Sequence, residues 1–339
     1  MNQIDSSLVV LIGASLIALI TSRVNLPLTP MLLIFGLVIG AIPGIPHLAM
    51  SAHVILFIFL PPLLFDAAFN LDLTMLWSSR RGVLVLALPG VLLATGVGGI
   101  LVHLTTALPW SQALLFGAII AATDPVAVLA TFRTLNADRR LSVLLEGESL
   151  LNDGIALVDA VGGDVRPARI AGTFGYELAG ALTLGIVVEF VGHRVIAFAR
   201  DHLTEMSLSI TIAYGAFLLG DTLHVSAVFT TLSAAVKLGQ LERKHGNAFS
   251  AEFAHLLHGL WGLFAFLANA ALFVLMGMDM RFSVLRDHFR AVLWGIAAAL
   301  LGRIAVAYGL NRFGFPLTRA ERHVVFWGGL RGAVALAAV

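Results

Sequence analysis

The 339-residue sequence contains no cysteine, and only 12% of its residues are charged. The absence of cysteine excludes disulfide bonds and metal sites built on thiolates. The charged share is about half that of a soluble globular chain. The net charge is +1 and no long basic run occurs, so nothing indicates binding to nucleic acid. No nucleophile and base, and no metal motif, stand at a spacing typical of enzymes, so we expect neither an enzyme nor a resident cofactor.

Hydrophobic residues, by contrast, make up 59% of the chain, and the mean hydropathy is +0.94. The apolar runs are repeatedly long enough for a helix across a bilayer core of roughly 30 Å, which needs about 20 residues. The linkers between these runs are short and leave no room for a soluble domain. The sequence therefore predicts an all-α polytopic membrane protein with one transmembrane domain over 1–339. Its twelve predicted spans are 6–22, 28–43, 51–69, 82–104, 111–131, 141–161, 172–198, 207–221, 223–240, 255–278, 289–311 and 323–339.

Basic residues are distributed unevenly between the two sides of these spans. If the N-terminus lies outside the cell membrane, the cytoplasmic loops and the span ends next to them hold fourteen Lys and Arg residues, and the outer loops and their span ends hold five. This asymmetry favours an outside N-terminus, because the cytoplasmic loops of membrane proteins carry an excess of basic residues. Two further arginines, Arg303 and Arg331, fall within predicted spans, where each needs a partner.

Helix-breaking residues interrupt several predicted spans. They are Pro61-Pro62, Pro89-Gly90, Asp124-Pro125, Gly328-Gly329 and Gly332. In secondary transporters, discontinuous helices lie near the membrane midplane in corresponding positions of two inverted repeats, and their ends help to hold ions. The breaks in the fifth and twelfth spans belong to segments that run in opposite directions. This pattern favours an inverted-repeat fold with discontinuous helices.

Two acids stand inside apolar runs, Asp124 before a proline and Asp153 in the next span. Intramembrane acids are costly and normally face a wet cavity, pair with a base or bind an ion. Ser149 and Asp153 are four residues apart and share one helix face. Carboxylate, hydroxyl and carbonyl oxygens suit a hard cation. We therefore expect Asp153, Asp124, the Ser149 hydroxyl and the Thr123 carbonyl to surround one monovalent cation, with Asn152 bracing the unwound segment by hydrogen bonds.

Three other interpretations are compatible with these residues. In the first, Asp124 caps the second half of a kinked helix, while Asn152 and Asp153 join helices by hydrogen bonds. The second is a cation channel, which would also line its path with acids but would pass cations without opposed proton movement. The third is a membrane module that folds or assembles without transporting.

Several segments of this chain resemble the signatures of one transporter family, the NhaP-type sodium/proton exchangers of the cation:proton antiporter-1 family. These segments are 121–128 (AATDPVAV), 146–154 (EGESLLNDG) and 328–334 (GGLRGAV). The segments 60–66 (LPPLLFD) and 267–273 (LANAALF) resemble the family as well, so the similarity covers nearly the whole chain.

The resemblance implies a secondary active transporter that works in pH homeostasis. Its substrate would be a small inorganic cation, sodium or potassium, exchanged one for one against a proton. Asp153 would carry the cation or the proton in turn, and Asp124 would join the ion site. The resemblance also implies a homodimer within membrane lipid. Its transport part would include about 51–161 and 255–339, and its dimerisation part about 1–43 and 172–240.

The resemblance also implies partners for the two intramembrane arginines. Glu148 would form a structural ion pair with Arg303, and Arg331 would neutralise Asp66 or the ends of the broken helices. A snorkelling Arg331 is the alternative. Members of the family continue with further spans after the segment that contains Arg331, so we expect C-terminal spans to be missing from this chain. A transport-inactive fragment is then a further alternative.

Overall fold

The computed structural model of the protein describes residues 3–24, 26, 28–42, 52–123, 138–159, 167–199, 201–244, 251–280, 282–310 and 317–328. Within these ranges, every regular element is a helix. The helices are α1 (Gln3–Val24), α2 (Leu28–Gly40), α3 (Ala52–Phe69), α4 (Leu73–Ala87), α5 (Pro89–Thr105), α6 (Trp110–Ala121), α8 (Arg139–Asp159), α9 (Pro167–Ile196), α10 (His202–Thr222), α11 (Ala227–Lys244), α12 (Ala251–Asp279), α13 (Phe282–Asp287), α14 (Phe289–Ile304), the π-helix η1 (Ala305–Gly309) and α15 (Arg319–Gly328).

Where its residues are described, each of the twelve predicted spans corresponds to a helix or to consecutive helices in this set. The parts 124–131 and 329–339 of the fifth and twelfth spans lie outside the described residues. Among the described residues, five segments are long and apolar enough to cross a membrane: Leu73–Thr105, Gly175–Ile196, His202–Thr222, His255–Asp279 and Phe289–Gly309. Shorter apolar helices are Ile12–Val24, Leu28–Gly40, Val54–Phe69 and Trp110–Ala121.

The predicted helix breakers act in different ways. α4 ends at Ala87 and α5 begins at Pro89, a position where a proline costs no helical hydrogen bond. α6 ends at Ala121, and Ala122 is already extended, so the chain leaves the helix before the predicted break at Asp124. Pro61-Pro62, in contrast, lies inside α3, which continues through it. Membrane helices tolerate proline where neighbouring groups satisfy the freed carbonyls.

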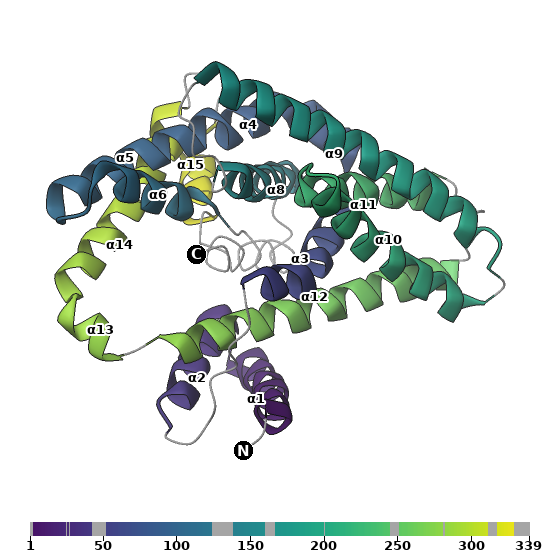
Figure 1. Ribbon diagram of the computed structural model, residues 1–339, viewed down its shortest axis with the longest axis horizontal. Helices are drawn as coiled ribbons and strands as arrows, with labels where there is room; N and C mark the ends of the chain where they lie inside the picture. Colours follow the sequence, from purple (N-terminus) through teal and green to yellow (C-terminus); the bar gives the residue numbers. More distant parts are fainter. Residues whose placement is uncertain are drawn as a thin grey trace. The chain divides into compact units, whose positions relative to one another are not determined.

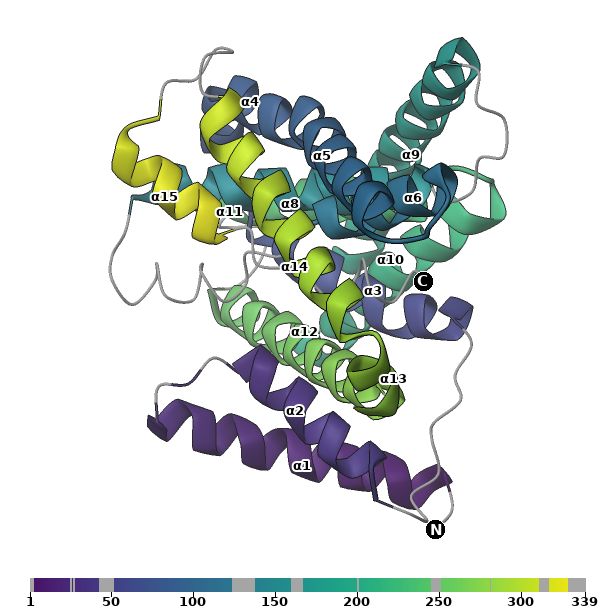
Figure 2. The ribbon, with the colours of Figure 1, turned by 90° about the vertical axis from the view of Figure 1, so that its left-hand side faces the viewer.

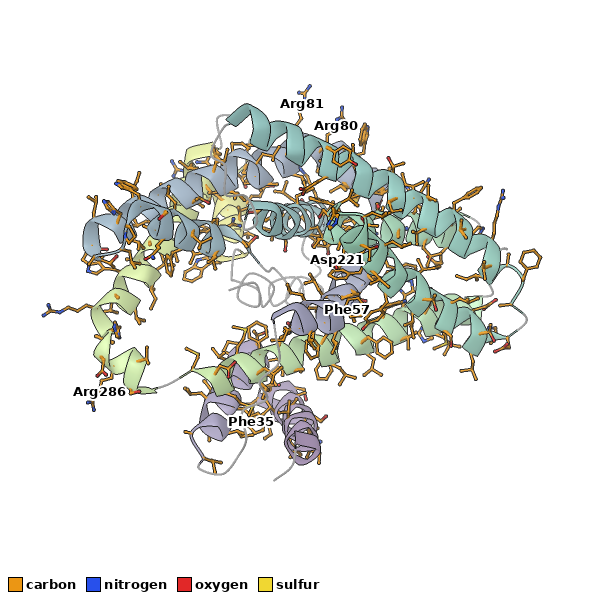
Figure 3. The ribbon with its side chains drawn as sticks, viewed as in Figure 1. Phe35, Phe57, Arg80, Arg81, Asp221 and Arg286 are labelled. Atoms are coloured by element: carbon orange, nitrogen blue, oxygen red, sulfur yellow. The ribbon has the colours of Figure 1, made fainter. Side chains whose placement is uncertain are left out.

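The helices group into two compact units, of which the first comprises 1–52, 78–152 and 269–339. In this unit α5, α6 and α14 pack side by side (Figure 1) around the buried residues Val102, Ala113 and Ala298. α1 and α2 also lie side by side (Figure 2), and Phe35 of α2 rests against α1 (Figure 3). A Cβ added at Gly277 of α12 would overlap the backbone of α2, so glycine permits this close helix contact.

The second unit comprises 53–77 and 153–268. Here α9 packs against both α10 and α11. α3 contacts the first half of α12 through the rings of Phe65 and Trp261, whose centroids are 4.1 Å apart. Arg243 of α11 donates hydrogen bonds to the carbonyl oxygens of Phe69 and Leu71 at the end of α3, at 2.9 and 2.8 Å. The cationic side chain thus satisfies carbonyls that a helix end leaves without donors.

Candidate ion-binding site

The predicted site residues fall on the end of α6 and on α8. Thr123 follows α6 directly, and Ser149 and Asn152 lie on α8, all three in the first unit and all buried. Asp153 continues the helix α8, but its side chain lies outside the described residues, as does the whole of Asp124.

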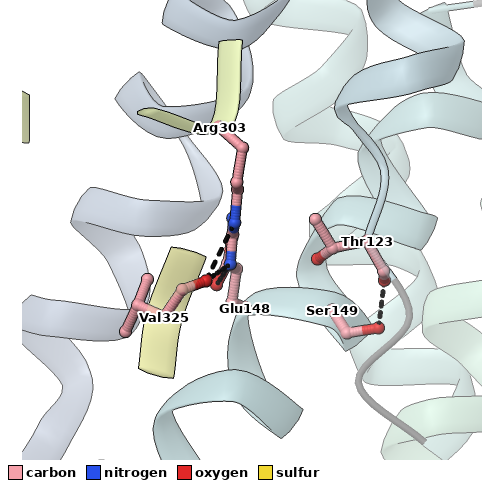
Figure 4. Close-up of polar contacts among 5 residues, drawn as sticks. All are labelled: Thr123, Glu148, Ser149, Arg303 and Val325. Atoms are coloured by element: carbon pink, nitrogen blue, oxygen red, sulfur yellow. Dashed lines mark hydrogen bonds and ion pairs between the residues drawn. The ribbon is translucent and has the colours of Figure 1, made fainter. Parts of the chain in front are cut away.

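The structure brings Ser149 and Thr123 into direct contact (Figure 4). The Ser149 hydroxyl donates a hydrogen bond of 2.7 Å to the Thr123 carbonyl oxygen, and the two residues are 7% and 5% exposed. Because α6 has already ended, this carbonyl has left the helical pattern and accepts from a side chain instead. Two uncharged oxygens of the kind that hard cations prefer are therefore held together in a buried position.

Asn152 is 1% exposed and reaches a different helix end from the one we predicted. In the amide orientation that suits its surroundings, its nitrogen donates to the carbonyl oxygens of Ala87 and Glu148, 3.2 Å from each. Ala87 is the last residue of α4, and the last carbonyls of a helix have no donors within that helix. The described hydrogen bonds of Asn152 thus brace the α4–α5 junction, whereas we had expected them at the segment beside Thr123.

Glu148 and Arg303 form a buried ion pair in which both carboxylate oxygens accept from the guanidinium (Figure 4). The Glu148 side chain is 1% exposed and that of Arg303 10%. Arg303 also donates twice to the carbonyl oxygen of Val325 in α15, from Nε at 3.0 Å and from a terminal nitrogen at 2.7 Å. Val325 belongs to α15. One arginine therefore joins α8, α14 and α15.

A small cavity lies between α5, α6, α8 and α14. The space that the centre of a water molecule can occupy within it is about 20 Å³, enough to hold a water molecule. Polar side chains and small residues share its wall: Gly90, Val91, Ala94, Ile120, Ala121, Thr123, Glu148, Asn152, Ala298, Ala299, Gly302, Arg303 and Val306. The ion pair and two of the predicted site residues thus line one cavity.

The predicted partnership of Asp66 and Arg331 concerns a residue outside the described ranges, since 329–339 are not described. Asp66 lies in the second unit, on α3, and its carboxylate accepts a hydrogen bond of 3.1 Å from the Asn70 amide. His258 of α12 contacts the same amide, with 2.9 Å between its Nδ1 and the Asn70 oxygen.

Sequence reasoning missed two partners in the site, the backbone carbonyls of Ala87 and Val325. A signal for each was present. A guanidinium has five donors, of which a carboxylate uses two, so Arg303 requires a further acceptor. Pro89 indicates that a helix ends shortly before it, and the last carbonyls of a helix need donors from elsewhere, such as the Asn152 amide.

The chain matches the family described as sodium/hydrogen exchanger, transmembrane, over residues 8–339. It is 30% identical over 350 residues to the Na(+)/H(+) antiporter NhaS2 of Synechocystis sp., with 98% of this chain and 63% of that protein covered. It is 33% identical over 329 residues to the Na(+)/H(+) antiporter ApNhaP of Aphanothece halophytica, with 92% and 62% covered. The chain thus spans about three-fifths of the length of these relatives.

Among solved structures, the sodium proton antiporter MjNhaP1 from Methanocaldococcus jannaschii is similar, with a TM-score of 0.77 and 21% sequence identity. The superposition covers 100% of this chain and 88% of that one. A likeness at this identity establishes the fold, and the predicted all-α multi-pass membrane architecture is confirmed.

Proposed function

Because the chain belongs to the family of transmembrane sodium/hydrogen exchangers, we propose that it is a secondary active transporter that exchanges sodium, or another monovalent cation, for protons. The observation that carries this proposal is the buried contact of the Ser149 hydroxyl with the Thr123 carbonyl, directly before the Asp124-Pro125 pair. These oxygens replace part of the water shell of a small cation at the point where α6 has ended.

The transported cation and the proton compete for Asp153. A carboxylate in a closed and partly dry site cannot stay negative alone, so it holds one of the two passengers while the site crosses the membrane. Glu148 does not serve as a second carrier, because Arg303 already compensates its charge. Asn152, the neighbour of Asp153 in sequence, carries no charge. One charge per half-cycle corresponds to electroneutral exchange of one cation for one proton.

The same proposal includes several features of the whole protein. The protein works in the cell membrane as a homodimer, with its N-terminus outside. A transport part, about 51–161 and 255–339, moves against a dimerisation part, about 1–43 and 172–240. Asp124 completes the cation shell, and Arg331 compensates Asp66.

The test uses purified protein in liposomes that contain a pH-sensitive dye, with the membrane voltage clamped. An inward sodium gradient should alkalinise the liposome interior, at a rate that is independent of the clamped voltage. Asp153→Asn should abolish this signal while the protein still inserts. Asp221→Asn should retain it, since this control removes the same charge from an exposed residue at the end of α10 (Figure 3).

Three outcomes would count against the proposal. Sodium-driven pH change in Asp153→Asn would remove Asp153 from the carrier role. Sodium flux without opposed proton movement would indicate a channel. A rate that follows the clamped voltage would reject the one-for-one stoichiometry. Replacement of sodium by potassium in the same assay identifies the preferred cation.

A further inference from the structure

Another acid lies within an apolar span, far along the chain from the proposed cation site. Glu189 belongs to the span Gly175–Ile196 of α9 and is 2% exposed, although only 22% of the apolar window of that span is buried. An ionisable side chain inside a membrane span is expensive and is by default a functional group with a partner to be found. The exchange mechanism proposed above makes no use of it.

Close helix packing keeps water away from Glu189. Ala181, Gly185 and Glu189 follow one another at intervals of four residues, so they form one buried stripe of α9. A Cβ at Gly185 would overlap the Ser233 hydroxyl and the Thr230 carbonyl oxygen of α11. The glycine therefore brings the two helices into backbone contact one turn before the carboxyl group.

The charged group that faces Glu189 from a neighbouring helix is Lys237 of α11, which attracts its carboxylate electrostatically. Lys237 is exposed, and the Oε1 atom of Glu189 has no hydrogen-bond partner among the residues that the structure describes. On α9 itself, His193 follows one turn later, and the Arg194 guanidinium lies 4.1 Å above the Phe190 ring.

α10, the other helix packed on this part of α9, brings an apolar side chain to this level. Ile212 of α10 lies against Gly192, three residues beyond Glu189. The titratable residues of α10 lie elsewhere on it: His202, Glu205 and Asp221 near its ends, and Tyr214, whose hydroxyl donates to the Ile58 carbonyl.

A buried carboxyl group in this setting has two ways to avoid an uncompensated charge. It is ionised while Lys237 is near, or it carries a proton when the flexible lysine turns towards the water. We propose that Glu189 is a second proton-binding site of this protein, separate from the cation site and occupied in alternation with its pairing to Lys237. The ligand is the proton itself, and the site lies within the α9–α11 contact.

Infrared difference spectroscopy of the purified protein tests this directly, because a protonated carboxyl has its own C=O stretching band. Glu189 should give a band that disappears as the pH is raised. The band should be missing from Glu189→Gln and retained in Glu177→Gln, which replaces another glutamate of α9 that is only half-buried. The band should also persist in Asp153→Asn and in the presence of sodium. Failure of this proposal can therefore be distinguished from failure of the exchange mechanism.

Lys237→Met should keep the Glu189 band up to a higher pH, by about one pH unit or more, because an opposite charge nearby normally favours the ionised form.

Mass spectrometry of the wild-type protein treated with an apolar carbodiimide, which reacts with protonated carboxyls, is a second measurement that requires no variant. The Glu189 peptide should be modified at low pH and protected at high pH. Identical spectra of wild type and Glu189→Gln at every pH, pH-independent modification, or loss of the band on addition of sodium would each overturn the proposal.

Discussion

Replacing Arg303 should destabilise the protein more than replacing its acidic partner, Glu148. The guanidinium makes two hydrogen bonds to Glu148 and two to the carbonyl oxygen of Val325. Arg303→Ala leaves a carboxylate that is 1% exposed without its counter-charge, and it also removes two donors from the Val325 carbonyl of α15. Glu148→Ala removes the counter-charge of the arginine but leaves its bonds to Val325 in place.

The expected losses in the free energy of unfolding follow from these hydrogen bonds and charges. Removing one member of a buried ion pair typically costs about 3 to 5 kcal/mol. We expect Arg303→Ala to lie near the upper value and Glu148→Ala near the lower one. The double variant keeps neither charge, but the Val325 carbonyl still lacks its donor, at a cost of about 1 to 3 kcal/mol. It should therefore be more stable than the sum of the single losses predicts, by at least about 2 kcal/mol.

The free energy of unfolding of each variant in detergent can be measured by denaturant titration with tryptophan fluorescence. Arg286→Ala is the matched control, because its side chain is 90% exposed and projects away from α13 (Figure 3). That change should stay within about 0.5 kcal/mol. Equal losses for the two single variants would show that the bonds to Val325 contribute nothing, and additive losses in the double variant would show that the pair is not coupled.

Two further predictions concern the site and the helix ends. Ser149→Ala should raise the apparent KM for sodium about tenfold with little change in the maximal rate, because losing a buried hydrogen bond to a carbonyl costs about 1 to 3 kcal/mol. An unchanged KM in the liposome assay would contradict the role of this hydroxyl. Asp201 caps α10, and the hydroxyl and N–H of Thr204 that donate to its carboxylate hold its pKa below the usual range. The cap therefore stabilises the helix above the unfolded pKa of about 4, and this stabilisation is lost as the pH falls through the pKa of Asp201 in the folded protein. Hydrogen exchange in the first turn of α10 should be faster in Asp201→Ala than in wild type at pH 7, and the two rates should be similar at strongly acidic pH.

Local sequence predicted the positions of the helices well. Every predicted span has its helix, and Pro89 ends one helix and begins the next as its missing N–H requires. The end of α6 at Ala121 also agrees with the proline four residues later, because a proline has no N–H to donate to the carbonyl four residues before it and its ring crowds that carbonyl. These features depend on residue types within one or two turns, so a single sequence contains the information.

Other features depended on which helices meet. Pro61-Pro62 continues within α3 although the same residue type divides α4 from α5. The π-helix η1, Ala305–Gly309, begins two residues after Arg303, and its Tyr308 hydrogen-bonds His323 of α15. Neither outcome follows from propensity, because the neighbouring helix decides whether a freed carbonyl is satisfied.

The sequence by itself determined that this chain lies in a membrane and where its helices run, because hydration energy depends on side-chain type and on the length of an apolar run. It also supplied the residues of the proposed cation site, in the acids and hydroxyls of two spans. Tertiary structure alone decided which backbone carbonyls Asn152 and Arg303 bind. Glu148 and Arg303 stand 155 positions apart, and only the packing of α8, α14 and α15 brings a third partner, the Val325 carbonyl, within reach of the same guanidinium.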